Sequence, residues 1–246
     1  MLNGPTPSPD SPQPSVVSYR IIALLEVLIC SDYPTQIALA STFAAFGFGP
    51  MSGGHLVIGY VVLLSLADTA LLLALIWTFL SAHGETPREV FLGARPIRGE
   101  IAAGLPMTFG ALAIGIIVLG TIQLLLPGLH TVPHNPLQDL IQTPRDAALF
   151  AVVVVIAGGI REEIQRAFLL RRFERWLGGA GVGVVVASAA FGAGHLLQGV
   201  DAAIATGLLG AFWGVVYLRR RSVIAPVVSH SGFNVLQLAQ FLLIGA

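Results

Sequence analysis

Long apolar runs are the feature that most constrains how this sequence can fold. A helix that crosses a lipid bilayer needs about 20 consecutive, mostly apolar residues, and the runs at 57–80 and 101–126 meet that length. The composition agrees, because 55% of the 246 residues are hydrophobic and only 11% are charged, whereas a soluble domain carries about 25% charged residues. The sequence therefore predicts an all-α protein, a polytopic bundle of transmembrane helices.

About seven spans are expected along the chain. The first apolar stretch, 21–48, is broken at "CSDYP", which suits either one kinked helix or a short surface helix followed by a span. The remaining spans are expected at 57–80, 101–126, 147–160 with helix continuing to about 176, 182–197, 203–218 and 223–244.

The pattern of apolar and polar stretches divides the chain into three expected parts. Residues 1–20, rich in Pro and Ser, are expected to form a disordered cytoplasmic tail. Residues 21–126 are expected to hold the N-terminal transmembrane helices. Residues 147–246, with the last four spans, are expected to form a tight core bundle, because their frequent glycines let membrane helices approach closely.

The arginines predict an orientation. The chain has no lysine, and its arginines gather in alternate loops: Arg88, Arg95, Arg98, Arg171, Arg172, Arg175, Arg219, Arg220 and Arg221. The intervening loops, 127–146 and 198–201, carry only Arg145. Because cytoplasmic loops are enriched in Lys and Arg, we expect the N-terminus in the cytoplasm and the C-terminus outside, in a bacterial-type plasma (inner) membrane. The formal net charge of zero gives no support for a nucleic-acid partner.

Strongly polar residues inside the predicted core spans are the candidate site. They are Glu162, Glu163, Arg166, His195, His230 and Asn234. Such groups are costly within a membrane and indicate function by default. Each also has a structural interpretation: a solvated face for the glutamates, a hydrogen-bonded core histidine for His195, and an interhelical clasp for His230 with Asn234. Their presence together on three predicted helices favours a site.

The residue types suit hydrolysis of an amide bond. A carboxylate beside an imidazole can activate water, directly or as metal ligands, and a second imidazole with an amide can donate hydrogen bonds to an oxyanion. Glu162 and Arg166, four residues apart, share a helix face and are expected to pair. A nucleophilic mechanism is less favoured, because no serine lies in a Gly-x-Ser-x-Gly turn and the single Cys30 has no nearby partner.

At these residues the chain resembles the CPBP family of intramembrane proteases, which includes the CAAX proteases and bacteriocin-processing, Abi-like enzymes. The family pattern is Glu-Glu-x-x-x-Arg, Phe-x-x-x-His and His-x-x-x-Asn on three helices. The second and third motifs are met by "FGAGH", 191–195, and "HSGFN", 230–234. The first departs, because only two residues separate Glu163 from Arg166. The family's two glutamates fall on Arg161 and Glu162 if the motif is anchored on its arginine, or on Glu162 and Glu163 if it is anchored on the pair.

The resemblance implies an endopeptidase acting on a membrane-associated peptide or protein. It implies that Glu162, with His195, activates the attacking water, that His230 and Asn234 stabilise the oxyanion, and that Arg166 orients the glutamate pair. It leaves open whether a zinc ion, with Glu162, His195 and His230 as ligands, or no metal takes part. The site is expected to open toward the cytoplasmic half of the membrane, and the oligomeric state stays open.

Two other classes of function remain as alternatives. A non-catalytic binding scaffold or secretion factor on the same fold is motivated by the altered first motif. A small proton-coupled transporter is the third class, because Glu and His residues within spans can relay protons. The chain shows no inverted repeat with matching broken helices, the pattern expected of many transporters.

Overall fold

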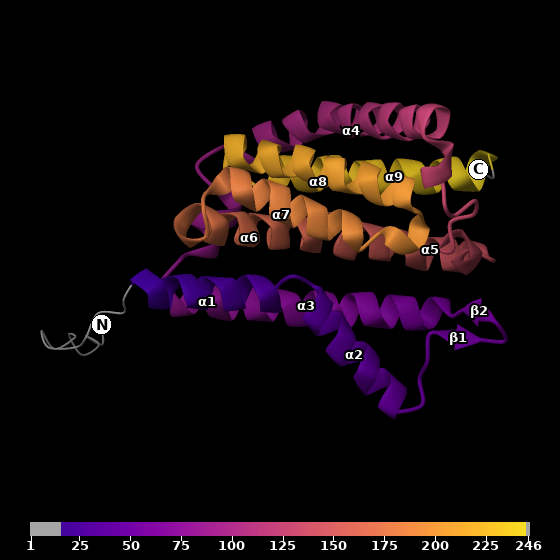
Figure 1. Ribbon diagram of the computed structural model, residues 1–246, viewed down its shortest axis with the longest axis horizontal. Helices are drawn as coiled ribbons and strands as arrows, with labels where there is room; N and C mark the ends of the chain where they lie inside the picture. Colours follow the sequence, from indigo (N-terminus) through magenta and orange to yellow (C-terminus); the bar gives the residue numbers. More distant parts are fainter. Residues whose placement is uncertain (1–15, 245–246) are drawn as a thin grey trace, which may run out of the picture.

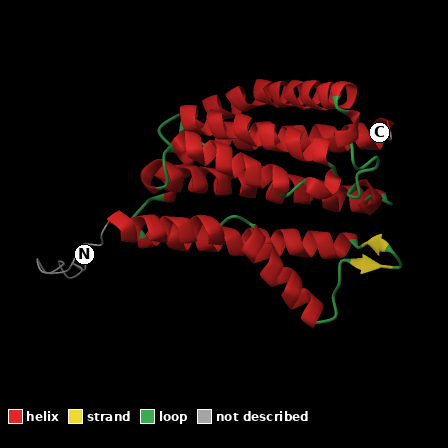
Figure 2. Ribbon diagram, in the orientation of Figure 1, coloured by secondary structure: helices red, strands yellow, loops and turns green. Residues whose placement is uncertain are grey.

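The computed structural model describes residues 16–244, and these form an all-α bundle with one minimal hairpin (Figures 1 and 2). The α-helices are α1 (Val16–Ile29), α2 (Tyr33–Ala45), α3 (Ile58–Ala82), α4 (Ile97–Leu125), α5 (Pro144–Val153), α6 (Glu162–Trp176), α7 (Ala180–Ala193), α8 (Val200–Arg220) and α9 (Ile224–Ile244). The hairpin pairs β1 (Met51–Ser52) with β2 (His55–Leu56). The short helices are the π-helical η1 (Arg88–Leu92) and η4 (Val154–Arg161) and the 3₁₀-helical η2 (Pro127–Leu129), η3 (Gln138–Leu140) and η5 (Leu196–Gln198).

The expected spans correspond to helices of unequal length. Within the described chain, four helices are long and apolar enough to cross a membrane: α3, α4, α8 and α9. Helix α7 has only 14 residues, and the continuous helical run from α5 through η4 to α6 carries charges in its middle. The expected count of about seven spans is therefore not confirmed.

The beginning of the described chain differs from the expectation in two ways. Helix α1 begins at Val16, so helix reaches into the tail expected over 1–20, and residues 1–15 of that tail lie outside the described residues. The first apolar stretch then folds as two helices, α1 and α2, of 14 and 13 residues. They meet where Asp32 takes a positive φ of 82°, and neither helix alone reaches the length of a span.

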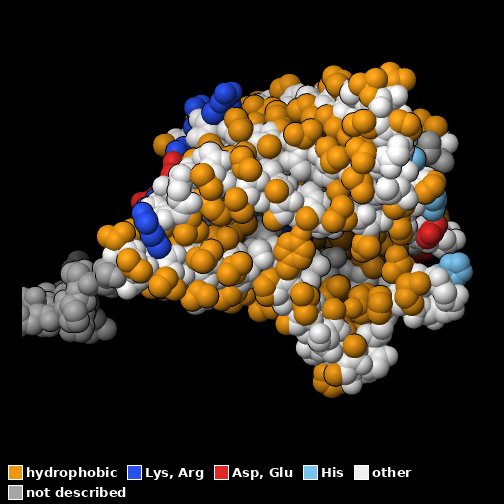
Figure 3. Space-filling view, in the orientation of Figure 1, with side chains coloured by type: hydrophobic (Ala, Val, Ile, Leu, Met, Phe, Trp, Pro, Cys, Tyr) orange, Lys and Arg blue, Asp and Glu red, His pale blue; other side chains and the backbone are white. Residues whose placement is uncertain are grey.

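The helices pack in two groups (Figure 1). Helix α4 packs along α9, α7 along α8 and α6 along α7, while α1 packs against α6 and α3 against α5 and η4. Helix α2 diverges from α1 toward the hairpin. The start of α1 and the end of α9 lie at opposite ends of the bundle. Figure 3 shows basic side chains at the end where α1 begins, histidines at the other end and apolar side chains between them.

A hydrophobic cluster fills the end of the bundle where the arginines lie. Its members from α3 and α6 include Leu72, Leu80 and Phe168, which are fully buried. Beside it the buried guanidinium of Arg172 pairs with Glu26 of α1 and with Glu85, which follows α3. Buried charges are tolerated only when paired in this way, so this network ties α1 and α3 to α6.

Close packing of α4 on α9 depends on a glycine. A Cβ added at Gly104 would lie 2.6 Å from the Cβ of Val228 and 2.8 Å from the carbonyl oxygen of Ala225. Gly110 lies on the same helix and faces open space, with nothing within 4 Å of an added Cβ. Small residues let membrane helices approach to backbone contact, and Gly104 does so here.

This contrast gives a stability prediction. We expect Gly104→Ala to lower the melting temperature of the detergent-purified protein, because overpacking costs about 1–3 kcal/mol. The matched control Gly110→Ala should keep or raise it, because alanine favours helix over glycine by about 1 kcal/mol. Equal melting temperatures for the two variants, measured by thermal unfolding, would contradict the packing described for α4 and α9.

Candidate active site

A cavity of about 1010 Å³ brings together residues from all three motifs. Five of the six expected site residues line it: Glu162, Arg166, His195, His230 and Asn234. The sixth, Glu163, lies behind the cavity wall, with its side chain 1% exposed. Helices α6 and α9 and the end of α7 supply these side chains. Residues about 70 positions apart in sequence therefore share one polar space inside an apolar bundle.

Glu163 forms the centre of the hydrogen-bond network. Its Oε1 accepts a hydrogen bond from Nη1 of Arg166 and lies 2.8 Å from Nδ1 of His230. The expected pairing of Arg166 with Glu162 is therefore wrong. Residues three apart also share a helix face, and the partner at that spacing is Glu163. This carboxylate links two of the three motifs.

Glu162 faces the cavity instead. Its Oε2 lies 3.8 Å from Nε2 of His230, and its Oε1 lies 3.6 Å from Nη2 of Arg161. Both distances exceed the length of a hydrogen bond. The carboxylate is thus close to an imidazole and a guanidinium, and its oxygens remain accessible to a molecule in the cavity.

Two aromatic rings hold the polar groups in place. The Phe191 ring lies 4.9 Å from the His195 ring and 6.1 Å from the His230 ring, and the Arg166 guanidinium lies over it at 4.7 Å. On the other side, Trp213 of α8 stacks on His230 with ring centroids 3.7 Å apart. Such contacts favour fixed ring orientations. Trp213 was missed by sequence reasoning, and its only signal was an aromatic residue in the small-residue run "GAFWG".

The remaining motif residues are oriented by backbone carbonyls. Nδ1 of His195 lies 2.8 Å from the carbonyl oxygen of Phe191. A carbonyl only accepts hydrogen bonds, so this nitrogen carries the proton and Nε2 is left for the cavity. The Asn234 side-chain amide donates to the carbonyl oxygen of Val154 at 3.1 Å. An added Cβ at Gly158 would lie 2.7 Å from that amide nitrogen, so α9 packs directly on the backbone of η4.

The π-helix η4 ends where the first motif begins. Its eight residues, 154–161, lead directly into Glu162. A π-helical turn is wider than an α-helical one and holds about one more residue, and such turns occur often at functional sites. The departure from the family pattern therefore coincides with a change of helical register that sequence periodicity does not reveal.

Arg161 is held by the N-terminal helices. Its Nη1 lies 2.5 Å from Oδ1 of Asp32 and 3.6 Å from Oδ2 of Asp68. Arg161 and Asp68 are both buried, and Asp68 sits in the middle of α3. The sequence gives no signal for the pairing of Asp68 with Arg161, because the two residues lie 93 positions apart. If the motif is aligned on its arginine, the position of the family's first glutamate is therefore occupied by Arg161, which is buried and ion-paired.

The cavity extends away from the arginines. Beyond the motif residues it is lined by the β1–β2 hairpin and by the loop around η3, at the end of the molecule where α9 ends. The half that carries the arginines is instead filled by a cluster of buried apolar side chains. The expectation that the site opens toward the cytoplasmic half of the membrane stays a prediction, because the fold alone does not say which end of the bundle is cytoplasmic.

A zinc ion finds no complete set of ligands in the described chain. Among residues 16–244, no group of three or more His, Cys, Asp and Glu side chains is arranged to hold a metal ion. The residues expected as ligands, Glu162, His195 and His230, line the same cavity but do not converge as tetrahedral zinc requires. No step of the reaction proposed below is assigned to a metal.

The environment of Arg161 predicts the effect of restoring the family's glutamate. We expect Arg161→Glu to destabilise the protein, because a new carboxylate would lie near Asp32, Asp68 and Glu162. Breaking a buried ion pair costs about 3–5 kcal/mol. The control Arg219→Glu makes the same charge change at an exposed position and should leave the melting temperature nearly unchanged. A stable and active Arg161→Glu protein would overturn this assignment.

Comparison with protein families identifies part of the chain. Residues 144–236 match the family model described as type II CAAX prenyl endopeptidase, Rce1-like. Comparison with curated proteins and with solved structures found no match. The matched segment contains all three motifs, and together with the long apolar helices it makes this chain a multi-pass membrane protein. The resemblance to the CPBP intramembrane proteases is thereby confirmed as a resemblance over residues 144–236, the segment that matches the Rce1-like model.

Proposed function

We propose that this chain is an intramembrane endopeptidase that hydrolyses a peptide bond of a membrane-associated substrate with an activated water. The observation that carries the proposal is the convergence of Glu162, His195, His230 and Asn234 on one cavity. The match to an endopeptidase family over the same residues supports it. The proposed catalytic core, 147–246, consists of α5 to α9, and 21–126 supplies the N-terminal transmembrane helices.

Glu162 is the proposed general base. A water in the cavity beside its carboxylate gives up a proton to Glu162 as the water oxygen attacks the substrate carbonyl carbon. Nε2 of His195, left free by the bond of Nδ1 to Phe191, accepts a hydrogen bond from the water's second O–H, which stays on the oxygen, and so orients the attack. Glu162 then passes its proton to the amide nitrogen as the carbon–nitrogen bond breaks. A base within hydrogen-bond reach of the water is the geometric requirement.

His230 and Asn234 are the proposed oxyanion donors. The Asn234 amide is anchored by one N–H on Val154, which leaves its second N–H for the oxyanion. Nδ1 of His230 donates to Glu163, so Nε2 donates to the oxyanion only when the ring carries both protons. Preorganised donors of this kind stabilise the transition state strongly.

Arg166 acts as a positioning residue in this proposal. It pairs with Glu163 and so fixes the carboxylate that orients His230. Its guanidinium also lies over the Phe191 ring, next to His195. Arg166 thereby acts on His230 through Glu163 and on His195 through Phe191, and in this proposal it does not contact the substrate.

We also propose an orientation in a bacterial-type plasma membrane. The arginine-rich loops and the N-terminus lie on the cytoplasmic side, and the C-terminus lies outside. The gathering of basic side chains at one end of the bundle (Figure 3) supports this orientation through the positive-inside rule.

Substitutions at the cavity test the proposed function. We expect Glu162→Gln, His195→Ala and His230→Ala to abolish cleavage of quenched fluorescent peptides by the purified protein. Asn234→Ala should lower kcat by about 10²–10³, the effect of losing one oxyanion donor. The control Glu89→Gln removes an exposed carboxylate at the arginine end and should retain full activity.

The same assay distinguishes an endopeptidase from the main alternative, a non-catalytic binding scaffold. Wild-type protein that is folded and monodisperse but cleaves no membrane-proximal peptide would favour a non-catalytic binding scaffold. The buried Arg161 at the first motif is the observation that motivates this alternative. Retained activity in the three variants expected to be inactive would remove the site assignment.

A further inference from the structure

We infer that substrate enters the site from the end of the molecule opposite the arginines, so that the substrate class is a polypeptide segment on the non-cytoplasmic side of the membrane. This inference rests on the proposed function. It starts from the shape of the cavity, which extends from Glu162 toward one end of the bundle.

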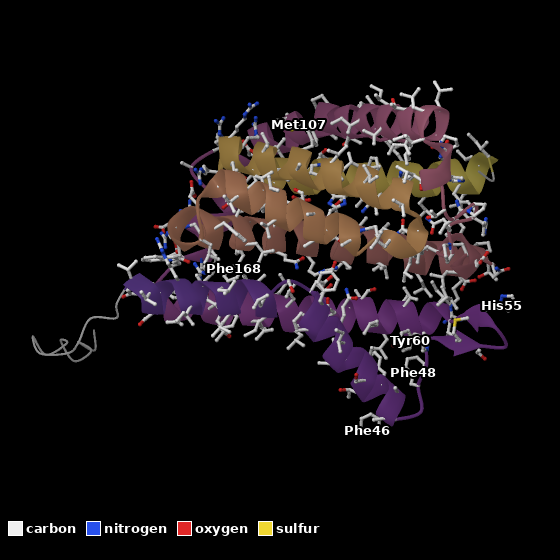
Figure 4. All side chains as sticks on the ribbon, in the orientation of Figure 1. Phe46, Phe48, His55, Tyr60, Met107 and Phe168 are labelled. Carbon is white, nitrogen blue, oxygen red and sulfur yellow. The ribbon has the colours of Figure 1, made fainter. Side chains whose placement is uncertain are left out.

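The wall of the cavity shows its direction. Beyond the motif residues the lining continues to His55 and Leu56 of the hairpin, Asn135 and Asp139 of the loop before α5, and Gln198 after α7. The hairpin lies at the end of the bundle where α9 ends, and Figure 4 shows His55 there. The cavity thus passes from the motif residues in the middle of the bundle to the surface at that end.

The opposite direction is closed by packed side chains. On α6 the lining ends at Leu169, and on α8 it ends at Trp213. On either side of Leu169 in sequence, Phe168 and Leu170 are fully buried, and Figure 4 shows Phe168 toward the arginine end. The ion network of Arg172 lies beyond them. A peptide cannot reach Glu162 through this densely packed region without unfolding it.

The chemistry of the outer cavity suits a polypeptide backbone. Amide side chains line it: Gln36, Asn135, Gln138, Gln198, Gln237 and Gln240. Each offers both donors and an acceptor, the combination that an extended chain presents. The two guanidiniums of the described lining, Arg161 and Arg166, are already paired with carboxylates. The cavity therefore favours an uncharged stretch of chain over a free C-terminal carboxylate.

The orientation of the bundle in the membrane determines on which side the cavity opens. The arginine-rich end is the cytoplasmic end by the positive-inside rule, and the open end of the cavity is the other one. An exported or membrane-anchored protein exposes polypeptide on the non-cytoplasmic side of the membrane. A prenylated C-terminus in the cytoplasm lies on the opposite side and could not enter the cavity from its open end.

Single cysteines test the inference directly. The native Cys30 is fully buried, so wild-type protein serves as the unlabelled blank. Leu197→Cys places a thiol at the cavity wall on an 84% exposed residue. Arg145→Cys is the matched control at the same end but outside the lining, and Glu89→Cys marks the arginine end. Each variant is exposed to a bulky, membrane-impermeant maleimide on intact spheroplasts and on inverted vesicles.

We expect Leu197→Cys and Arg145→Cys to react on spheroplasts, and Glu89→Cys to react only on inverted vesicles. Modified Leu197→Cys should lose most of its peptide cleavage, while modified Arg145→Cys should keep it, with the melting temperature unchanged in both. Labelling of Leu197→Cys only in inverted vesicles, or full cleavage after its modification, would overturn the inference. If unmodified wild type cleaves no peptide, the proposed function fails, and the labelling pattern still decides which side the cavity faces.

Discussion

The carboxylate of Glu163 is the contact on which the site depends. It is buried, and one oxygen receives both the guanidinium of Arg166 and the imidazole of His230. A charge in an apolar bundle is stable only when it is paired and hydrogen-bonded. Here the pairing also fixes geometry, because it joins α6 to α9 and holds His230 against Trp213. Loss of this one carboxylate would leave a buried guanidinium without its ion-pair partner and the imidazole of His230 without its hydrogen-bond acceptor.

The first motif is shorter than the family pattern, and the helix around it is irregular. The π-helical turn of η4 ends at Arg161, so Glu162 begins a new α-helical register. Glu162 then faces the cavity while Glu163 faces the protein interior. The two neighbouring carboxylates therefore have separate tasks: one is accessible to substrate, and the other organises the groups around it. Their difference comes from the direction each side chain takes rather than from its chemical type.

Apolar run length was enough to predict most helices from the sequence. The runs at 57–80 and 223–244 correspond closely to α3 and α9, because lipid requires long, internally hydrogen-bonded segments. The hairpin was not predicted, since it depends on a local turn. The break at "CSDYP" was visible in the sequence, but the choice between one kinked helix and two helices depends on the backbone turn at Asp32. The count of about seven spans is not confirmed, because α6 carries charges and α7 has only 14 residues.

The candidate site was predictable as a set of residues but not as a network. Polar groups in apolar runs are conspicuous, and five of the six line one cavity. Glu162, Glu163 and Arg166 all lie on α6, where spacings of three and of four residues both bring side chains together, so sequence spacing could not decide which carboxylate meets Arg166. The contacts of Trp213 and Asp68 join residues far apart in sequence, and no spacing rule reaches that far.

The partners of Arg161 make the matched segment dependent on the rest of the chain. Asp32 and Asp68 lie outside 144–236 and compensate a charge that lies inside it. The two halves are therefore not interchangeable modules. In a chimera, a core of this type joined to the N-terminal helices of a relative with a glutamate at this motif position would carry an orphaned guanidinium. The charge at position 161 thus sets which residues are acceptable at positions 32 and 68, and the reverse holds as well.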